Sequence, residues 1–237
     1  MLTPRYGCAT DVGRLRSENQ DSMYAGDGLF LVADGMGGQP AGDLASKLAI
    51  AELSTLTPPL SRAALEAAIN RANDRLLAEG RQDPRRYGMG TTLSGLAAVE
   101  QDRWAVVNIG DSRVYRYAAG RVEQLTVDHS AVQALVDAGL LDQRAALRHP
   151  RRNVVTRSLG TEPAPVPDIV LRHPVPGERF LICSDGLTNE LSDAEIGRLL
   201  AEADEPQQAA EQLVAQAVLA GGRDNVTVIV VQLDEAG

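Results

Sequence analysis

Three apolar runs in this sequence lead directly into an aspartate that has a glycine beside it. They end at Asp34-Gly35, Gly110-Asp111 and Asp185-Gly186, and a fourth aspartate, Asp224, precedes the apolar run 226–231. An aspartate at a strand end projects from the rim of a sheet, and the adjacent glycine lets backbone and ligand approach closely. Each pair taken singly is typical of a turn. Four of them at the ends of apolar runs favour a shared carboxylate cluster.

Carboxylates that lie close together repel one another strongly unless cations neutralise them. Their oxygens are hard ligands, so the pattern favours Mn²⁺ or Mg²⁺. Zinc is disfavoured because no histidine or cysteine has a zinc-ligand spacing; these residues are His129, His149, His173, Cys8 and Cys183. Two hard cations side by side can bridge a water, lower its pKa and present hydroxide for in-line attack on phosphorus.

A phosphoryl group at such a centre needs a cation for its non-bridging oxygens. Arginine suits this role because its planar fork binds two oxygens at once. The polar segment 13–21 contains Arg14 and Arg16. We interpret Arg14 as a solvated surface residue, which leaves Arg16 as the candidate.

The elements that must position these residues are mostly short runs rich in Val, Ile and Leu. Gly, Asp and Pro bound them, as is typical of strands, which we expect at 28–33, 92–99, 104–109, 113–117, 168–172, 179–184 and 226–233. Helical periodicity and capping signals predict helices at 41–56, 62–79, about 193–203 and 206–220. Consecutive strands without intervening helices favour antiparallel sheets over a Rossmann alternation.

Residues 128–167 interrupt this pattern with a short helix and a Pro- and Arg-rich loop, which predicts a flap subdomain within a single domain spanning 1–237. Five arginines gather there: Arg144, Arg148, Arg151, Arg152 and Arg157. They either attract acidic, phosphorylated segments or form an ordinary solvated face, and both hypotheses remain open at this point.

Composition narrows the class of partner. The net charge of −9 argues against a nucleic-acid or anionic-membrane partner, because both select a basic surface. Two cysteines without a CxxC spacing indicate no disulfide framework, which fits a reducing cytoplasm. The N-terminus lacks the apolar stretch of a signal peptide, and no apolar run reaches the ~18 residues of a membrane span.

Seven motifs occur in the order of the PP2C-type (PPM) serine/threonine phosphatases, and the chain resembles their compact bacterial branch from end to end. The motifs are Asp11-Val12-Gly13 to Asn19-Gln20-Asp21, Asp34-Gly35-Met36-Gly37-Gly38, Gly90-Thr91-Thr92, Gly110-Asp111-Ser112-Arg113, Thr156-Arg157-Ser158-Leu159-Gly160, Ser184-Asp185-Gly186-Leu187 and Asp224-Asn225-Val226-Thr227. The resemblance implies an α+β fold, an αββα sandwich of two central antiparallel sheets flanked by pairs of antiparallel helices.

The resemblance also implies a ligand set. Asp34 would bridge two metal ions and the Gly35 carbonyl would ligate one of them, while Asp185 and Asp224 would complete the shell of the other ion. Asp111 with Asp185 would match a third, weaker site.

Two further residues receive roles from the same resemblance. Arg16 falls on the phosphate-binding arginine, and Asp21 matches the acidic residue that orients the metal-bound water. The family implies phosphorylated protein substrates, a cognate Ser/Thr kinase, a bacterial source and a monomeric enzyme.

The chain departs from the family pattern at two positions. Met36 stands where many eukaryotic members have a histidine that is offered as general acid, which leaves a metal-bound water for that role. Gln20 stands where an acidic residue is frequent.

Two rival functions are open. Cys8 and Arg14 have the Cys-x5-Arg spacing of cysteine-dependent tyrosine phosphatases, although Asp11 would place negative charge in that phosphate cradle. A non-catalytic pseudophosphatase that binds phosphoproteins is the other alternative.

Overall fold

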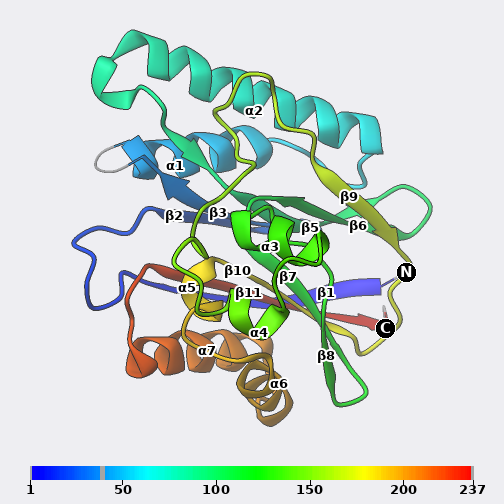
Figure 1. The fold of residues 1–237 in the computed structure, drawn as a ribbon. Helices are drawn as coiled ribbons and strands as arrows, with labels where there is room; N and C mark the ends of the chain where they lie inside the picture. Colours follow the sequence, from blue (N-terminus) through cyan, green and yellow to red (C-terminus); the bar gives the residue numbers. More distant parts are fainter. Residues whose placement is uncertain (1, 38–40, 236–237) are drawn as a thin grey trace.

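The computed structural model describes residues 2–37 and 41–235 and has four layers (Figure 1). Two antiparallel sheets pack face to face at the centre. One outer face is covered by α1 (Ala41–Leu53) and α2 (Arg62–Gln82), and the other by α6 (Asp193–Glu202) and α7 (Pro206–Ala220). The predicted αββα sandwich is therefore confirmed.

The five-stranded sheet joins the first and last strands of the chain, and the six-stranded sheet is built from strands between residues 21 and 172. The five-stranded sheet has the order β1 (Leu2–Asp11), β11 (Val226–Glu235), β10 (Arg179–Cys183), β7 (Arg113–Ala118) and β8 (Arg121–Gln124). The six-stranded sheet has the order β2 (Asp21–Gly26), β3 (Leu29–Met36), β5 (Leu93–Val99), β6 (Arg103–Ile109) and β9 (Asp168–Arg172), with β4 (Gly90–Thr91) paired to β3 beside β5.

Side-chain alternation along the strands divides the core into three apolar clusters. On β3, Leu29 and Leu31 pack under α1 and α2, whereas Phe30 and Val32 face the opposite sheet. The layer between the sheets consists of Phe30, Val32, Leu96, Trp104, Val106, Val114, Phe180, Ile182, Ile229, Val231 and Leu233. Inward-facing residues of both sheets therefore share one dry interface, as in other sandwiches.

Four strands were not predicted: β1, β2, β8 and the two-residue β4. Among the described residues, β1 is an edge strand that pairs only with β11, and most of its residues are exposed or half-buried, so it carries no apolar alternation. At Gly7 on this strand, a Cβ atom would collide with the backbone of Gln207 at the start of α7. The polar segment 13–21 leads into β2, which begins at Asp21.

Helix boundaries differ by a few residues from the prediction. The first helix ends at Leu53 instead of about residue 56, and α2 continues to Gln82 before the short 3₁₀ helix η1 (Pro84–Arg86). The last helix, α7, spans 206–220 as predicted.

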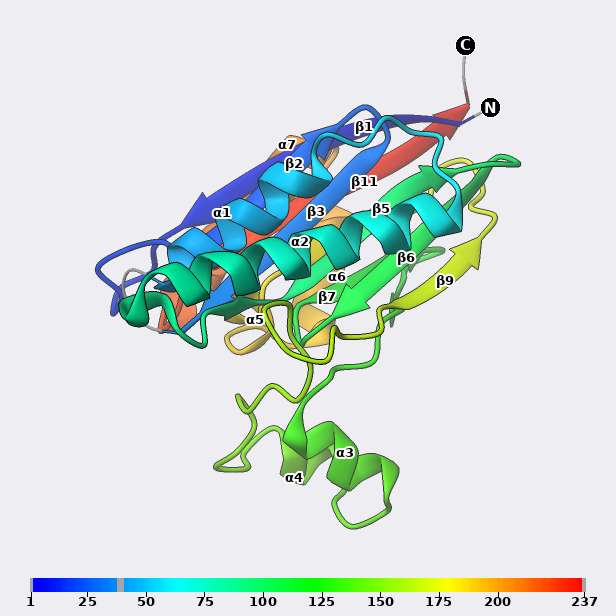
Figure 2. The ribbon, with the colours of Figure 1, turned by 90° about the horizontal axis from the view of Figure 1, so that it is seen from above.

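The predicted flap region projects from the sandwich (Figure 2). It contains two short helices instead of one, α3 (Ala131–Asp137) and α4 (Gln143–Ala146), followed by an irregular segment that returns to β9. The outgoing and returning chains meet at the base, where the Thr156 amide donates to the His129 carbonyl at 2.8 Å.

Candidate active site

Strand alternation directs Asp34 into the mouth between the two sheets. Asp34 continues the inward-facing row of Phe30 and Val32 on β3, and Asp21 is its direct cross-strand partner on β2. Asp34 lies inside β3 and not at its end, because the strand continues to Met36. The ladder changes at this point, since β3 pairs with β5 up to Val32 and with β4 from Gly35 onward.

The opposite sheet contributes two more aspartates. Asp185 follows β10 and begins the short helix α5 (Asp185–Thr188), while Asp224 lies in the turn before β11. Asp111 occupies the turn between β6 and β7. The predicted convergence of aspartates from separate strands is thus present.

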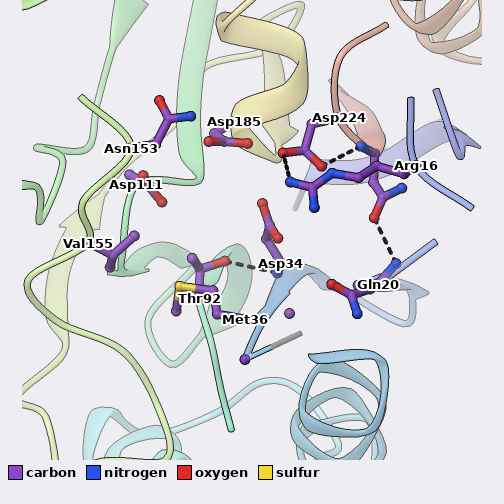
Figure 3. A pocket seen from close by; sticks show the side chains of 13 residues that line it. Arg16, Gln20, Asp34, Met36, Thr92, Asp111, Asn153, Val155, Asp185 and Asp224 are labelled. Atoms are coloured by element: carbon purple, nitrogen blue, oxygen red, sulfur yellow. Dashed lines mark hydrogen bonds and ion pairs between the residues drawn. The ribbon is translucent and has the colours of Figure 1, made fainter. Parts of the chain in front are cut away.

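Six of the seven candidate site residues line one pocket (Figure 3): Arg16, Asp34, Gly35, Asp111, Asp185 and Asp224. The remaining lining residues, none of which was among the candidate site residues, are Gln20, Met36, Gly37, Thr92, Asn153, Val155 and Asn225. Gly38, the last residue of the Asp34 motif, lies outside the described residues.

Three of the pocket carboxylates, those of Asp34, Asp111 and Asp185, have a pKa raised above that of an isolated aspartate. Burial, followed by the charges of Asp21 and Asp185, raises the pKa of Asp34 well above its usual range. Burial and the charge of Asp224 raise the pKa of Asp185 to about 6. Burial and the charge of Asp185 raise the pKa of Asp111 to about 8. The cluster therefore favours a bound positive charge.

Arg16 supplies one positive charge from the loop between β1 and β2. Its Nη2 donates to Asp224 Oδ2 at 2.7 Å, and this hydrogen bond raises the pKa of the guanidinium further. The side chain is 53% exposed, so its other N–H donors remain accessible. Arg14 does not line the pocket, in agreement with its interpretation as a surface residue.

The Arg16 loop is fastened to the turn that carries Asp224. The Arg14 amide donates to the Gly222 carbonyl at 2.6 Å. Gly13 has a φ of +75°, and a Cβ there would collide with the Asp224 carbonyl. Glycine is therefore required for the loop to approach this turn.

Asn225 is a site residue that sequence reasoning missed. Its Nδ2 donates to the carbonyls of Val12 and Glu18 at 2.9 Å each, and its Oδ1 accepts from the Gln20 amide at 2.8 Å. Asn225 thus orders both ends of the loop that presents Arg16. Its only sequence signal was its place in the Asp224-Asn225-Val226-Thr227 motif.

Asp21 lies behind the pocket and does not line it. Its side chain is buried, and Oδ2 accepts a hydrogen bond from Ser184 Oγ at 2.7 Å. Within residues 2–37 and 41–235, Oδ1 has no hydrogen-bond partner. Burial raises the pKa of this carboxyl to about 7, with Asp185 and Asp224 adding to the effect. A buried carboxylate oxygen without a donor is a free acceptor for a water or a cation.

Buried hydroxyls connect the strand of Asp34 with the turn of Asp111. The Asp34 amide donates to Thr92 Oγ1 at 2.9 Å, and Thr92 Oγ1 lies 2.7 Å from Ser112 Oγ. On the other side of the turn, the Gly110 amide donates to His129 Nδ1 at 3.0 Å. This turn is therefore held from both the sandwich and the flap.

The donor set fits a divalent cation. Within the described part of the chain, no three His, Cys, Asp or Glu side chains come close enough together to hold one ion by themselves. Mg²⁺ and similar ions commonly keep several water ligands and take only one or two carboxylates. Mutually repelling carboxylates, the carbonyl of Gly35 at the pocket wall and the free Asp21 Oδ1 together supply the hard oxygen ligands that such an ion requires.

The tyrosine-phosphatase alternative requires a loop from Cys8 to Arg14 that surrounds a phosphate. Cys8 instead lies within β1 opposite Ile229 and does not line the pocket. Cys8 therefore lies in an extended strand and not in the phosphate-binding loop that this alternative requires.

Comparison with known proteins gives the family. The sequence profile described as Protein phosphatase 2C (PP2C_2) matches residues 16–220. The chain belongs to the protein phosphatase 2C family. The serine/threonine protein phosphatase PstP of Mycobacterium tuberculosis is 40% identical over 233 residues, which are 97% of this PP2C chain. The chain spans only 45% of the length of that relative.

Solved structures agree with the PP2C fold. The crystal structure of the M. tuberculosis phosphatase PstP/Ppp superposes with a TM-score of 0.93 at 39% identity and covers 99% of this chain and 100% of that one. A PstP catalytic domain in complex with two manganese ions superposes with a TM-score of 0.91 at 37% identity, with the same shares of the two chains covered. None of the helices in the described residues has the length and apolar character needed to cross a membrane.

Proposed function

We propose that this PP2C chain is a metal-dependent protein phosphatase that hydrolyses phosphoserine and phosphothreonine monoesters. The observation that carries the proposal is one pocket in which aspartates from both sheets meet a single arginine. Membership of the family and the likeness to phosphatases of 37–40% identity support the same activity.

The proposed ligands are those that the family resemblance implied. Asp34 and the Gly35 carbonyl on β3 would hold two Mn²⁺ or Mg²⁺ ions together with Asp185 and Asp224 from the other sheet. Asp111 would contribute with Asp185 to a weaker third ion. When bound, the cations supply Lewis acidity that lowers the pKa of a water and directs it toward phosphorus without a covalent phosphoenzyme.

The residues of the chain have separable roles in this reaction. Arg16 donates one N–H to Asp224, so its remaining donors can hold two non-bridging phosphoryl oxygens. Asp21 presents its unpaired Oδ1 as the acceptor that orients the attacking water. Met36 lines the pocket but has no proton to donate, so we assign protonation of the leaving group to solvent in the site.

The substrate class and cellular setting are further parts of the proposal. The substrates would be phosphorylated proteins acted on by a cognate Ser/Thr kinase, and the enzyme would be a cytoplasmic monomer. Residues 1–237 would form one PP2C-like domain with the flap at about 128–167 as its subdomain.

A metal titration of phosphopeptide hydrolysis tests the function. The wild-type chain should release phosphate from phosphothreonine peptides in proportion to Mn²⁺ occupancy, and EDTA should abolish the release. Asp34→Asn should be inactive at every Mn²⁺ concentration, while Asp111→Ala should mainly change the Mn²⁺ dependence. Phosphopeptide binding without turnover at millimolar Mn²⁺ would instead support a pseudophosphatase, and a phosphorylated side chain trapped during turnover would refute direct attack by water.

A further inference from the structure

Four exposed arginines on the flap have no acidic partner. Residues 143–157 contain five arginines and no acidic residue, in a chain whose net charge is −9. Arg157 differs from the others, because its Nη1 donates to Asp168 Oδ1 at 2.8 Å. The other four are exposed and, across residues 2–37 and 41–235, make no side-chain hydrogen bond or ion pair. We call them the arginine face: Arg144, Arg148, Arg151 and Arg152.

Surface arginines elsewhere in this protein are mostly neutralised. Arg5, Arg62 and Arg198, for example, each donate to a carboxylate at 2.6–2.8 Å. Like charges gathered without counter-charges repel one another and lower the stability of the fold. The arginine face therefore has an electrostatic cost that no contact within the described chain offsets.

The arginine face adjoins the mouth of the pocket. Arg151 and Arg152 directly precede Asn153, and Asn153 and Val155 line the pocket. Figure 3 places these two lining residues across the pocket from Arg16. Consecutive Cα atoms are about 3.8 Å apart, so Arg152 begins one residue from the pocket wall. An extended peptide advances about 3.3 Å per residue, so side chains a few positions from a bound phosphoresidue reach this face.

We propose that the arginine face binds acidic side chains that flank the phosphorylated residue of the substrate. This inference rests on the proposed phosphatase function and specifies which phosphoproteins the enzyme prefers. Guanidinium groups bind carboxylates and phosphates through paired N–H donors, so aspartate, glutamate or a second phosphorylated residue is suited to the face. Nucleic acid and anionic membranes fit less well, because the chain as a whole is acidic and would be repelled by them.

Matched phosphopeptides test the preference. Two phosphothreonine peptides would carry three glutamates on the N-terminal or the C-terminal side, and their controls would carry glutamine at the same positions. We expect the wild type to cleave at least one glutamate peptide with a higher kcat/KM than its glutamine control. Arg151→Gln/Arg152→Gln should reduce that ratio roughly threefold to tenfold, the size expected for two exposed charge pairs. Raising the salt concentration should reduce it in the same way.

Arg75→Gln/Arg121→Gln is the matched control, since it removes two arginines on α2 and at the start of β8 that do not line the pocket. It should retain the full glutamate preference. Hydrolysis of p-nitrophenyl phosphate, which has no flanking residues, reports the amount of intact site in each preparation.

An equal rate for glutamate and glutamine peptides in the wild type would overturn the inference. So would an unchanged ratio in Arg151→Gln/Arg152→Gln. Loss of binding to phosphatidylserine vesicles or to RNA by this variant, with an unchanged peptide ratio, would assign the face to those partners instead. If no peptide or p-nitrophenyl phosphate is hydrolysed at all, the phosphatase assignment itself is wrong.

Discussion

Asp21 and Asp34 are directly paired across the antiparallel strands β2 and β3, with the Asp21 side chain buried and the Asp34 side chain half-buried at the pocket wall. Like charges in directly opposed positions destabilise a sheet, and each of these groups raises its cost further by losing water. The pair is therefore a weak point of the fold that a cation stabilises. Substitutions at this pair should therefore change the stability of the protein as well as its catalytic rate.

Replacing Asp34 should separate activity from stability. Asp34→Asn removes one charge of the directly opposed pair, so the metal-free protein should unfold at a higher temperature than wild type. The same substitution should lower kcat by roughly 10³-fold or more, because the loss of a metal ligand affects the reaction more than the loss of a single hydrogen bond does. Thermal unfolding in EDTA and phosphopeptide kinetics in Mn²⁺ measure the two effects. A variant that is both less stable and fully active would contradict the assignment.

The stability of the metal-free protein should depend on the ionisation of Asp111. Burial and Asp185 raise the pKa of this carboxyl from 3.8 to about 8. Between these pH values the unfolded chain releases the proton while the folded chain retains it, so this group lowers stability as the pH rises. Asp111→Asn should therefore gain little stability near pH 4 and several kcal/mol at pH 8. Urea denaturation in EDTA at both pH values measures the gain in unfolding free energy over wild type. A larger gain at the acidic pH would contradict the predicted pH dependence.

Arg16 and Arg14 form a natural comparison, since both lie on one loop and only Arg16 lines the pocket. Arg16→Ala should reduce kcat/KM for phosphopeptides by about 10²-fold, mainly through KM, because a charge-assisted contact to the phosphoryl group is lost. Arg14→Ala should change kcat/KM by less than about twofold. Equal kinetics of the two variants would remove Arg16 from the substrate site.

His129 should stabilise the turn that carries Asp111. Its buried Nδ1 accepts from the Gly110 amide at 3.0 Å, and its Nε2 lies 3.1 Å from Asp168 Oδ2. His129→Ala leaves that amide without an acceptor and should cost about 1–3 kcal/mol of unfolding free energy. It should also raise the Mn²⁺ concentration needed for full activity.

His173 is exposed and provides the matched control. His173→Ala should change the unfolding free energy by no more than about 0.5 kcal/mol. Identical metal titrations of His129→Ala and wild type would show that the turn keeps its position without this hydrogen bond.

The sequence predicted the parts of the fold that are apolar and continuous. Runs such as 226–233 become strands because they supply the buried layers on both faces of a sheet. β1 escaped prediction because it depends on a partner distant in the chain, since Leu2–Asp11 pairs with Val226–Glu235, whereas β2 pairs with the adjacent β3 but consists mostly of polar or small residues. Their own residues lack the alternation that marks a half-buried strand.

The same distinction applies to the site. Aspartates were found because several of them follow apolar runs, a signal that local sequence carries. The contributions of Asn225, Thr92 and Ser184 were not found, because each acts through hydrogen bonds to segments far away in the chain. Asn153 and Val155 line the pocket because the segment that returns from the flap passes beside it, which no periodicity indicates.

Asp34 belongs to one sheet, whereas Asp185 and Asp224 are attached to the other, so the hydrophobic layer between the sheets sets the spacing between them. A bulkier or smaller side chain at Phe180 or Ile229 would shift one group of oxygens relative to the other. Mg²⁺ demands near-ideal octahedral geometry, so such a shift would act directly on ion choice. Members of this fold can therefore change their metal preference through substitutions of apolar core residues between the sheets, while all metal-ligand residues are retained.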